Sequence, residues 1–164
     1  FLAPSHQDLV HGFLGFLGNA LQPEGMVVDE RPKLPKDRLA VSDALVQQVS
    51  AILDGISWDA ALIEEFTGCF LTRPKPQVRF SPGTLPLEAF ERRLRKQGRL
   101  TLALPSRGLV RRGMLFLNGE AHRVRRDTLT LFKQLVSQRA VPLPLSLRDV
   151  ELFYAWYAAG YLMV

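Results

Sequence analysis

The sequence predicts a mainly helical α+β protein, with a helical region over residues 1–75 and a winged-helix-like domain over residues 83–164. Three observations predict this. Apolar residues recur at helical spacing through most of the first region. The second region combines helical patterns with a strand pattern and an Asn-Gly hairpin signal. The charge also changes sign between the two regions, which indicates two modules with different surfaces.

Three helices are expected in residues 1–75. The stretch "HQDLVHGFLGFLGNAL" follows Ser5, whose side chain can cap a helix, and Ser42 and Ser57 are the expected caps of two further helices. Between them, "QPEGMVVDERPKLPKDRLA" contains prolines and many charges, as linkers do. The three apolar faces exceed what the helices can bury in one another, so we expect a helical dimerisation region that forms a homodimer.

The second region begins with a basic helix, "PLEAFERRLRKQ", which Gly98 should end. "RLTLALP" alternates in the manner of a strand, and "GMLFLNGEAHRV" should fold as a hairpin. The dipeptide Asn118-Gly119 favours a type I′ turn, and Phe116 is expected in the core of the hairpin.

Two helices should close the chain, capped by Asp127 and Ser146, with Gly160 ending the second. The last residues, "YLMV", can add a short strand. The aromatic-rich end "ELFYAWYAAGYLMV" is interpreted as core, with an exposed interaction patch as the alternative. A hairpin that precedes the two final helices makes this winged helix atypical.

The charge is strongly asymmetric. Between Arg73 and Arg126 there are 14 Lys or Arg against 3 Asp or Glu, a net charge of +11. The rest of the chain has 7 Lys or Arg and 13 Asp or Glu, a net charge of −6. The basic part suits phosphates or an acidic partner, whereas the plainer interpretation is a solvated face without a partner.

Ten basic side chains in this part are candidate phosphate or partner contacts. Guanidinium groups bind phosphate oxygens in a bidentate manner, and no interleaved aromatic residues indicate base stacking, so sequence specificity is not predicted. The candidates are Arg92, Arg93, Arg95, Lys96, Arg99, Arg111, Arg112, Arg123, Arg125 and Arg126.

No catalytic constellation or metal-ligand motif is recognisable, and neither a P-loop nor a dinucleotide-binding glycine motif occurs. His6, His11 and His122 are interpreted as ordinary polar residues. Cys69 is expected to be a packed thiol, and a single cysteine fits a cytoplasmic protein. No apolar run is long enough to span a membrane, so no membrane partner is expected. Because the chain opens on Phe1, we interpret it as a fragment.

Several stretches together resemble one enzyme family. "FLAPSHQDLVHGFLGFL" resembles the GF-x-AP segment and the helix that follow the catalytic barrel of the cupin-4 family. "FTGCFLTRPKP" resembles the end of a later helix in that family, with its T-x-P-K pattern, and "LFLNGEAHRV" and "AAGYLMV" resemble its C-terminal hairpin and end. This family includes the JmjC-type ribosomal oxygenases, which use Fe(II) and 2-oxoglutarate.

The resemblance implies that the chain is the C-terminal part of such an oxygenase, one that hydroxylates an arginine of a ribosomal protein. The iron ligands of the family, an H-x-D…H triad, precede the GF-x-AP segment. No residue here matches them, so no cofactor is expected in the chain itself, and Fe(II) and 2-oxoglutarate are expected in the parent. "LTRPKP" would join the two modules, and RNA is a candidate partner of the basic face.

Two alternatives remain. One is a winged-helix nucleic-acid-binding regulator with a helical dimerisation arm, which would show steep salt dependence and prefer a defined duplex. The other is an interaction domain that dimerises without binding nucleic acid.

Overall fold

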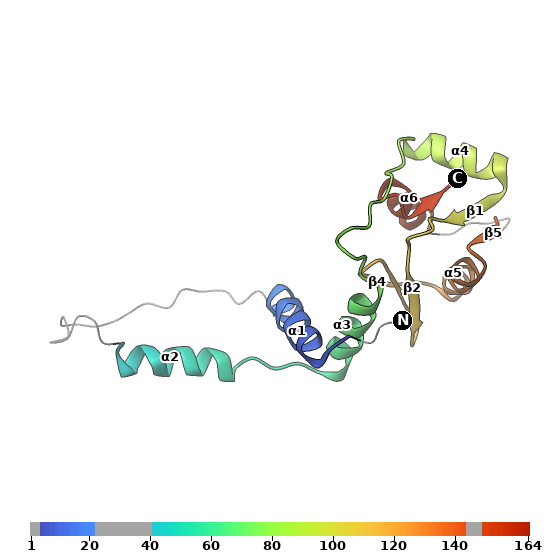
Figure 1. Cartoon of the computed structure of the whole chain (residues 1–164). Coiled ribbons are helices and arrows are strands. Elements are labelled where there is room, and N and C mark those ends of the chain that lie inside the picture. Colours follow the sequence, from blue (N-terminus) through green and yellow to red (C-terminus); the bar gives the residue numbers. More distant parts are fainter. Residues whose placement is uncertain (1–3, 22–40, 144–148) are drawn as a thin grey trace. The chain divides into compact units, whose positions relative to one another are not determined.

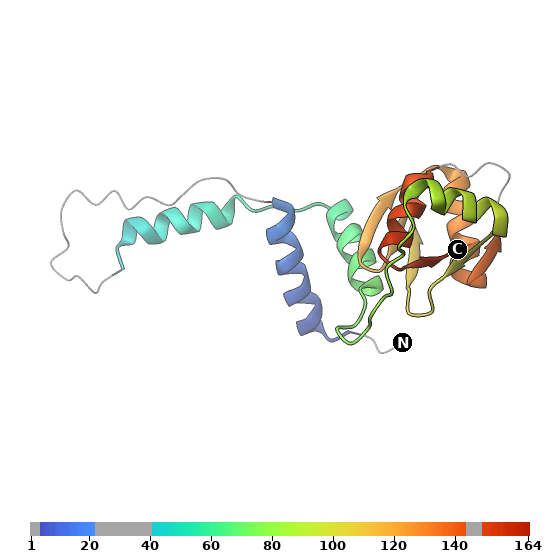
Figure 2. The same ribbon diagram turned by 90° about the horizontal axis from the view of Figure 1, so that it is seen from above.

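The computed structural model describes residues 4–21, 41–143 and 149–164 (Figures 1 and 2). Its contacts divide the chain into two compact units, Phe1–Ile63 and Glu64–Val164. This division falls within a helix and before residue 75, the end of the helical region expected from the sequence.

The first unit contains α1 (His6–Leu21), α2 (Asp43–Asp54) and the first turn of α3 (Ala60–Thr72). The expected cap at Ser5 is confirmed, because its hydroxyl accepts the amide of Asp8 at 3.1 Å. The Asp8 carboxylate in turn accepts the amide of Ser5 at 3.3 Å, which completes a reciprocal capping arrangement. Ser42 also caps as expected, accepting the amide of Leu45 at 3.2 Å.

Helix α3 begins later than expected. The Asp59 carboxylate accepts the amide of Leu62 at 2.8 Å and thereby caps the helix, which starts at Ala60. The prediction of Ser57 as the cap is therefore wrong. Aspartate is as good a cap as serine, and here it stands immediately before the first helical residue.

The end of α3 packs on the hairpin of the second unit. A Cβ atom at Gly68 would overlap the ring of Phe116, so only glycine permits this close approach. The buried hydroxyl of Thr72 accepts the amide of Gly119 at 3.0 Å and donates to the carbonyl of Gly68 at 2.8 Å. The stretch "TGCFLT" thus attaches the helix to the hairpin.

Replacing Gly68 by alanine is expected to lower the free energy of unfolding by about 1–3 kcal/mol, because the added methyl group displaces the buried Phe116 ring. Urea unfolding followed by circular dichroism measures this. Gly15→Ala is the control, since nothing lies within 4 Å of its Cβ position. Equal stability of the two variants would contradict the close packing.

In its described residues, the second unit continues from α3 with three helices and six short strands. Its strands form two antiparallel sheets, with the orders β5-β1-β6 and β2-β3-β4. Figure 1 shows these elements, which are α4 (Leu87–Gln97), β1 (Arg99–Leu102), β2 (Gly108–Arg111), β3 (Met114–Leu117), β4 (Glu120–Arg123), α5 (Arg126–Gln138), β5 (Ala140–Pro142), α6 (Val150–Ala158) and β6 (Leu162–Met163).

The expected strands are present. The turn between β3 and β4 has positive φ at Asn118 (51°) and Gly119 (95°), as its dipeptide predicts. The final residues form β6, which pairs with β1. Strands β2 and β5 were not predicted, although β2 completes the sheet by pairing with β3. The hairpin precedes the last two helices, and the mainly helical α+β class is confirmed.

The core of this unit lies among α4, α5, α6 and the central strands. Trp156 of α6 is 1% exposed, and its ring centroid lies 5.2 Å from that of Phe153 and 5.7 Å from that of Phe132. Phe116 is buried as well. The aromatic-rich end of the chain is therefore core, as the plainer interpretation predicted.

One expected cap differs in the structure, and another lies outside the described residues. Arg125 occupies the N-cap position of α5 without a side-chain bond, so Asp127 lies inside the helix and its prediction as the cap is wrong. Ser146 lies outside the described residues. Asp149 precedes α6 with φ 57°, and its carboxylate accepts the hydroxyl of Thr128 at 2.6 Å. This tertiary bond links α6 to α5, and a local sequence pattern does not show it.

The helix ends follow the predicted glycines. Gly98 (φ 63°) ends α4 and Gly160 (φ 79°) follows α6, both in left-handed conformation. Helix α5 instead ends at Arg139, with φ 67°. Its guanidinium group donates to three backbone carbonyls in the turn after β1, those of Ala103, Leu104 and Ser106. Arg139 thus has a structural role.

Candidate functional site

Helix α4 presents one basic stripe because its other face is buried. Phe90 and Leu94, four residues apart, are 0% and 3% exposed. The Phe90 ring lies 5.0 Å from that of Tyr157 and 5.5 Å from that of Tyr154. These contacts fix the rotation of the helix about its own axis, so the residues facing away from the core are set by the sequence spacing.

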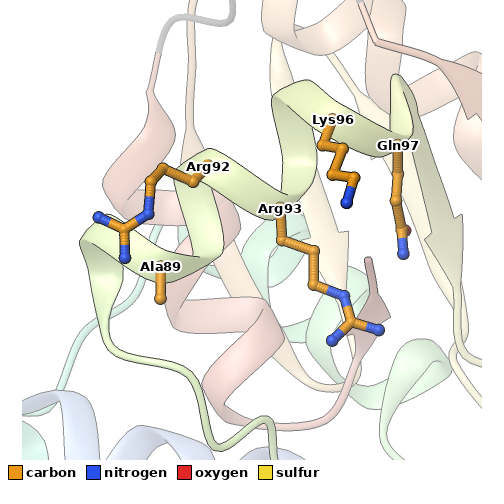
Figure 3. A pocket seen from close by; sticks show the side chains of 5 residues that line it. All are labelled: Ala89, Arg92, Arg93, Lys96 and Gln97. Carbon is orange, nitrogen blue, oxygen red and sulfur yellow. The ribbon is translucent and has the colours of Figure 1, made fainter.

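The outward residues form what we call the α4 stripe. They follow the helical spacing i, i+3, i+4, i+7 and i+8, and together they line a hollow of about 520 Å³. Figure 3 shows the side chains of Arg93, Lys96 and Gln97 extending to the same side of the helix. The members are Ala89, Arg92, Arg93, Lys96 and Gln97.

The α4 stripe contains no carboxylate. The acidic residues of the helix, Glu88 and Glu91, lie on a neighbouring stripe together with Arg95. Arg95 forms an ion pair with Glu91 at 2.8 Å. Within the described part of the chain, none of the three cations of the α4 stripe makes such a pair. The ion pair between Arg95 and Glu91 therefore lies outside the α4 stripe.

Arg111 and Arg112, in the β2–β3 hairpin, share one acidic partner. Arg111 at the end of β2 and Arg112 in the following turn both contact the Glu64 carboxylate at 2.9 Å. A hydrogen bond from Arg111, with the charges of both arginines, lowers the pKa of Glu64 against the opposing effect of burial. The stabilisation of the folded state that comes from ionised Glu64 is therefore fully present above the ordinary pKa of a glutamate. It is lost as the pH falls through the lowered pKa of Glu64.

The remaining expected contacts lie apart from α4 or at its end. Arg99 begins β1, and Arg123 ends β4. Arg125 and Arg126 stand at the N-terminus of α5, where cations interact unfavourably with the helix dipole. All four are exposed, and none forms an ion pair among the residues that the structure describes. The structure therefore does not gather the ten expected contacts into one cluster.

The neutral members of the α4 stripe were not predicted from the sequence. Ala89 and Gln97 line the same hollow as the three cations. A search for residues at helical spacing opposite the apolar positions would have found them, whereas a search for charge alone does not.

The histidines and the cysteine do not form a second site. His6 and His11 are exposed on α1, and His122 lies edge-on to Trp156, with ring centroids 5.6 Å apart. Burial raises the pKa of the Cys69 thiol, consistent with a packed residue. No cluster of three or more His, Cys, Asp or Glu suited to a metal occurs in the described ranges.

Helix α2 exposes apolar side chains. It has no buried residue, and four of its large apolar side chains are between 42% and 59% exposed. These are Val46, Val49, Ile52 and Leu53. They occupy one side of the helix, which we call the α2 apolar face. No described helix is long and apolar enough to cross a membrane.

Comparison with known proteins identifies relatives of the chain. The sequence model of a family described as ROXA-like winged helix matches residues 55–163. No curated protein sequence matches the chain significantly.

Three solved structures of YcfD from Escherichia coli share the fold over 99% of this chain, which spans less than half of theirs. An X-ray structure matches with 16% identity and TM-score 0.68, covering 45% of its chain. A complex with cobalt and succinic acid, described as a ribosomal oxygenase, has 18% identity, TM-score 0.67 and 47% coverage. A complex with cobalt and 2-oxoglutarate has 17% identity, TM-score 0.65 and 47% coverage.

Proposed function

The chain belongs to the ROXA-like winged-helix family, and we propose that it is the C-terminal part of an iron- and 2-oxoglutarate-dependent ribosomal oxygenase. The single observation that carries this proposal is the fold likeness to YcfD, described as a ribosomal oxygenase, over nearly the whole chain. The resemblance seen in the sequence agrees with this likeness.

We propose that this part of the protein has a structural role. Among the described residues, no cluster of three or more His, Cys, Asp or Glu suits a metal ion. We propose that Fe(II) and 2-oxoglutarate bind elsewhere in the complete protein. The helical region would pair two copies of the protein, and the winged helix would help to position a cytoplasmic ribosomal protein for hydroxylation of an arginine side chain.

Dimerisation is supported by the α2 apolar face. Its members remain substantially exposed in the single chain, and burying them against a second copy would remove apolar surface from water. Homodimers most often place such a face against its own symmetric copy.

The coding sequence upstream of the Phe1 codon tests the proposal. We expect it to encode a cupin barrel with an H-x-D motif and a later histidine, which would supply the iron ligands. A start codon at or just before Phe1 would contradict the proposal.

A nucleic-acid-binding regulator is the alternative function. The exposed cations that lack ion pairs in the described residues favour it, because such groups are available to phosphates. This function requires tight binding to one defined DNA duplex, with affinity falling steeply as salt rises. Equal binding to unrelated duplexes would count against it.

A further inference from the structure

We propose that the α4 stripe binds the phosphate backbone of a folded RNA. The inference rests on the proposed function, since a protein that acts on a ribosomal protein works close to ribosomal RNA. It goes further by selecting three cations, Arg92, Arg93 and Lys96, from the ten that the sequence offered.

The first support is that the stripe is preorganised. Phe90 and Leu94 anchor α4 in the core, so the outward residues are held on one line without the cost of ordering a loop. Arg92 and Lys96 are four residues apart, which separates their Cα atoms by about 6 Å along the helix axis. A row of cations on a rigid helix can contact successive phosphates of one strand.

The second support is the availability of the charges. None of the three cations forms an ion pair among the described residues, although Glu88 lies one helical turn before Arg92. Of these three cations, only Lys96 lies in the last turn of the helix, where the negative end of the helix dipole stabilises a positive charge. By contrast, Arg95, Arg111 and Arg112 already have acidic partners within the chain. Of the seven candidate cations without an ion pair among the described residues, the three of the α4 stripe share one hollow, whereas Arg99, Arg123, Arg125 and Arg126 do not line it.

The third support is the chemistry of the hollow. Two guanidinium forks, an ammonium group and the amide of Gln97 all supply hydrogen-bond donors, which phosphate oxygens accept. The small side chain of Ala89 leaves room for a ligand beside them.

The same residues favour a phosphate backbone over bases or an acidic peptide. The stripe has no aromatic residue on which a base could stack. Peptides that dock on folded domains commonly use apolar anchors, and Ala89 is the only apolar member of the stripe. Contacts restricted to the backbone predict that the RNA is read by its shape and not by its base sequence.

Fluorescence anisotropy of a labelled RNA hairpin with the 164-residue chain tests this inference. The triple variant Arg92→Gln, Arg93→Gln, Lys96→Gln keeps the side chains polar and leaves the core untouched. We expect the dissociation constant for RNA to rise about 10- to 100-fold at physiological salt. The slope of the logarithm of the binding constant against the logarithm of the salt concentration should decrease by the equivalent of about two to three phosphate contacts.

A second triple variant is the matched control. Arg111→Gln, Arg112→Gln, Lys133→Gln removes the same charge from exposed positions, two of them already paired with Glu64. We expect less than about threefold weakening from it. Circular dichroism establishes that both variants are folded.

Four outcomes would overturn the inference: no RNA binding by the parent chain at low salt, equal losses in the two triple variants, tighter binding to a DNA hairpin of the same sequence, or displacement of RNA by polyglutamate as effective as by unlabelled RNA. These outcomes are independent of the proposed oxygenase. If the RNA-binding test fails but a cupin barrel is encoded upstream, the proposed oxygenase function stands and the RNA inference is rejected. If the chain binds RNA as expected but no cupin barrel is encoded upstream, the oxygenase function is rejected and RNA binding by the α4 stripe remains.

Discussion

Replacing Trp156 by alanine is expected to lower the free energy of unfolding of the winged-helix unit by about 3–5 kcal/mol. The ring is 1% exposed and packs against Phe132 of α5, Phe153 of α6 and His122 of β4. Its removal leaves a cavity where these three elements meet. Its buried indole N–H has no hydrogen-bond partner among the described residues, so we expect the loss to come from packing and not from a polar contact.

The chain provides its own control, because it has one other tryptophan. Trp58 is 52% exposed and touches Phe13 edge-on, with ring centroids 5.4 Å apart. We expect Trp58→Ala to cost less than about 1 kcal/mol. Urea unfolding followed by far-ultraviolet circular dichroism compares the two variants. Similar losses for both would contradict the position of Trp156 at the centre of the core.

Placing two negative charges on the α2 apolar face is expected to convert a dimer into a monomer. In the double variant Val49→Glu, Ile52→Glu, two carboxylates would enter the interface twice, once from each copy. Burying unpaired carboxylates is strongly unfavourable, so the dissociation constant should rise by at least about 100-fold. Sedimentation velocity at tens of micromolar, with mass from light scattering, measures the change.

A second double variant separates the effect of the face from the effect of charge. Gln47 and Ala51 lie on the opposite side of α2, at the spacing i, i+4. Gln47→Glu, Ala51→Glu adds the same charge there and should leave the dimer intact. A parent chain that is already monomeric at this concentration would refute the dimer, and equal dissociation by both variants would refute the assignment of the face.

Local signals predicted much of the fold. The caps at Ser5 and Ser42, the turn at Asn118-Gly119 and the end of α4 at Gly98 each depend on a side chain or backbone preference within a few residues. Features set by distant contacts were missed. Asp149, which precedes α6, accepts a hydrogen bond from Thr128, 21 residues earlier in the chain, and β2 pairs with β3.

The candidate surface could be predicted in composition but not in organisation. The charge pattern identified the ten candidate contacts, but it did not rank them. The pairing of Arg111 with Glu64 joins residues 47 positions apart, so no local pattern reveals that this arginine has an acidic partner. The α4 stripe could have been predicted from the sequence, because its members and the buried Phe90 and Leu94 follow helical spacing.

The measurement that tests the account most directly is the mass of ribosomal proteins after incubation with the complete gene product, Fe(II), 2-oxoglutarate and oxygen. The account predicts that one ribosomal protein gains the mass of a single oxygen atom, located on an arginine by peptide fragmentation. A control without 2-oxoglutarate should show no gain. Unchanged masses for every ribosomal protein, with a folded and iron-loaded protein, would contradict the account.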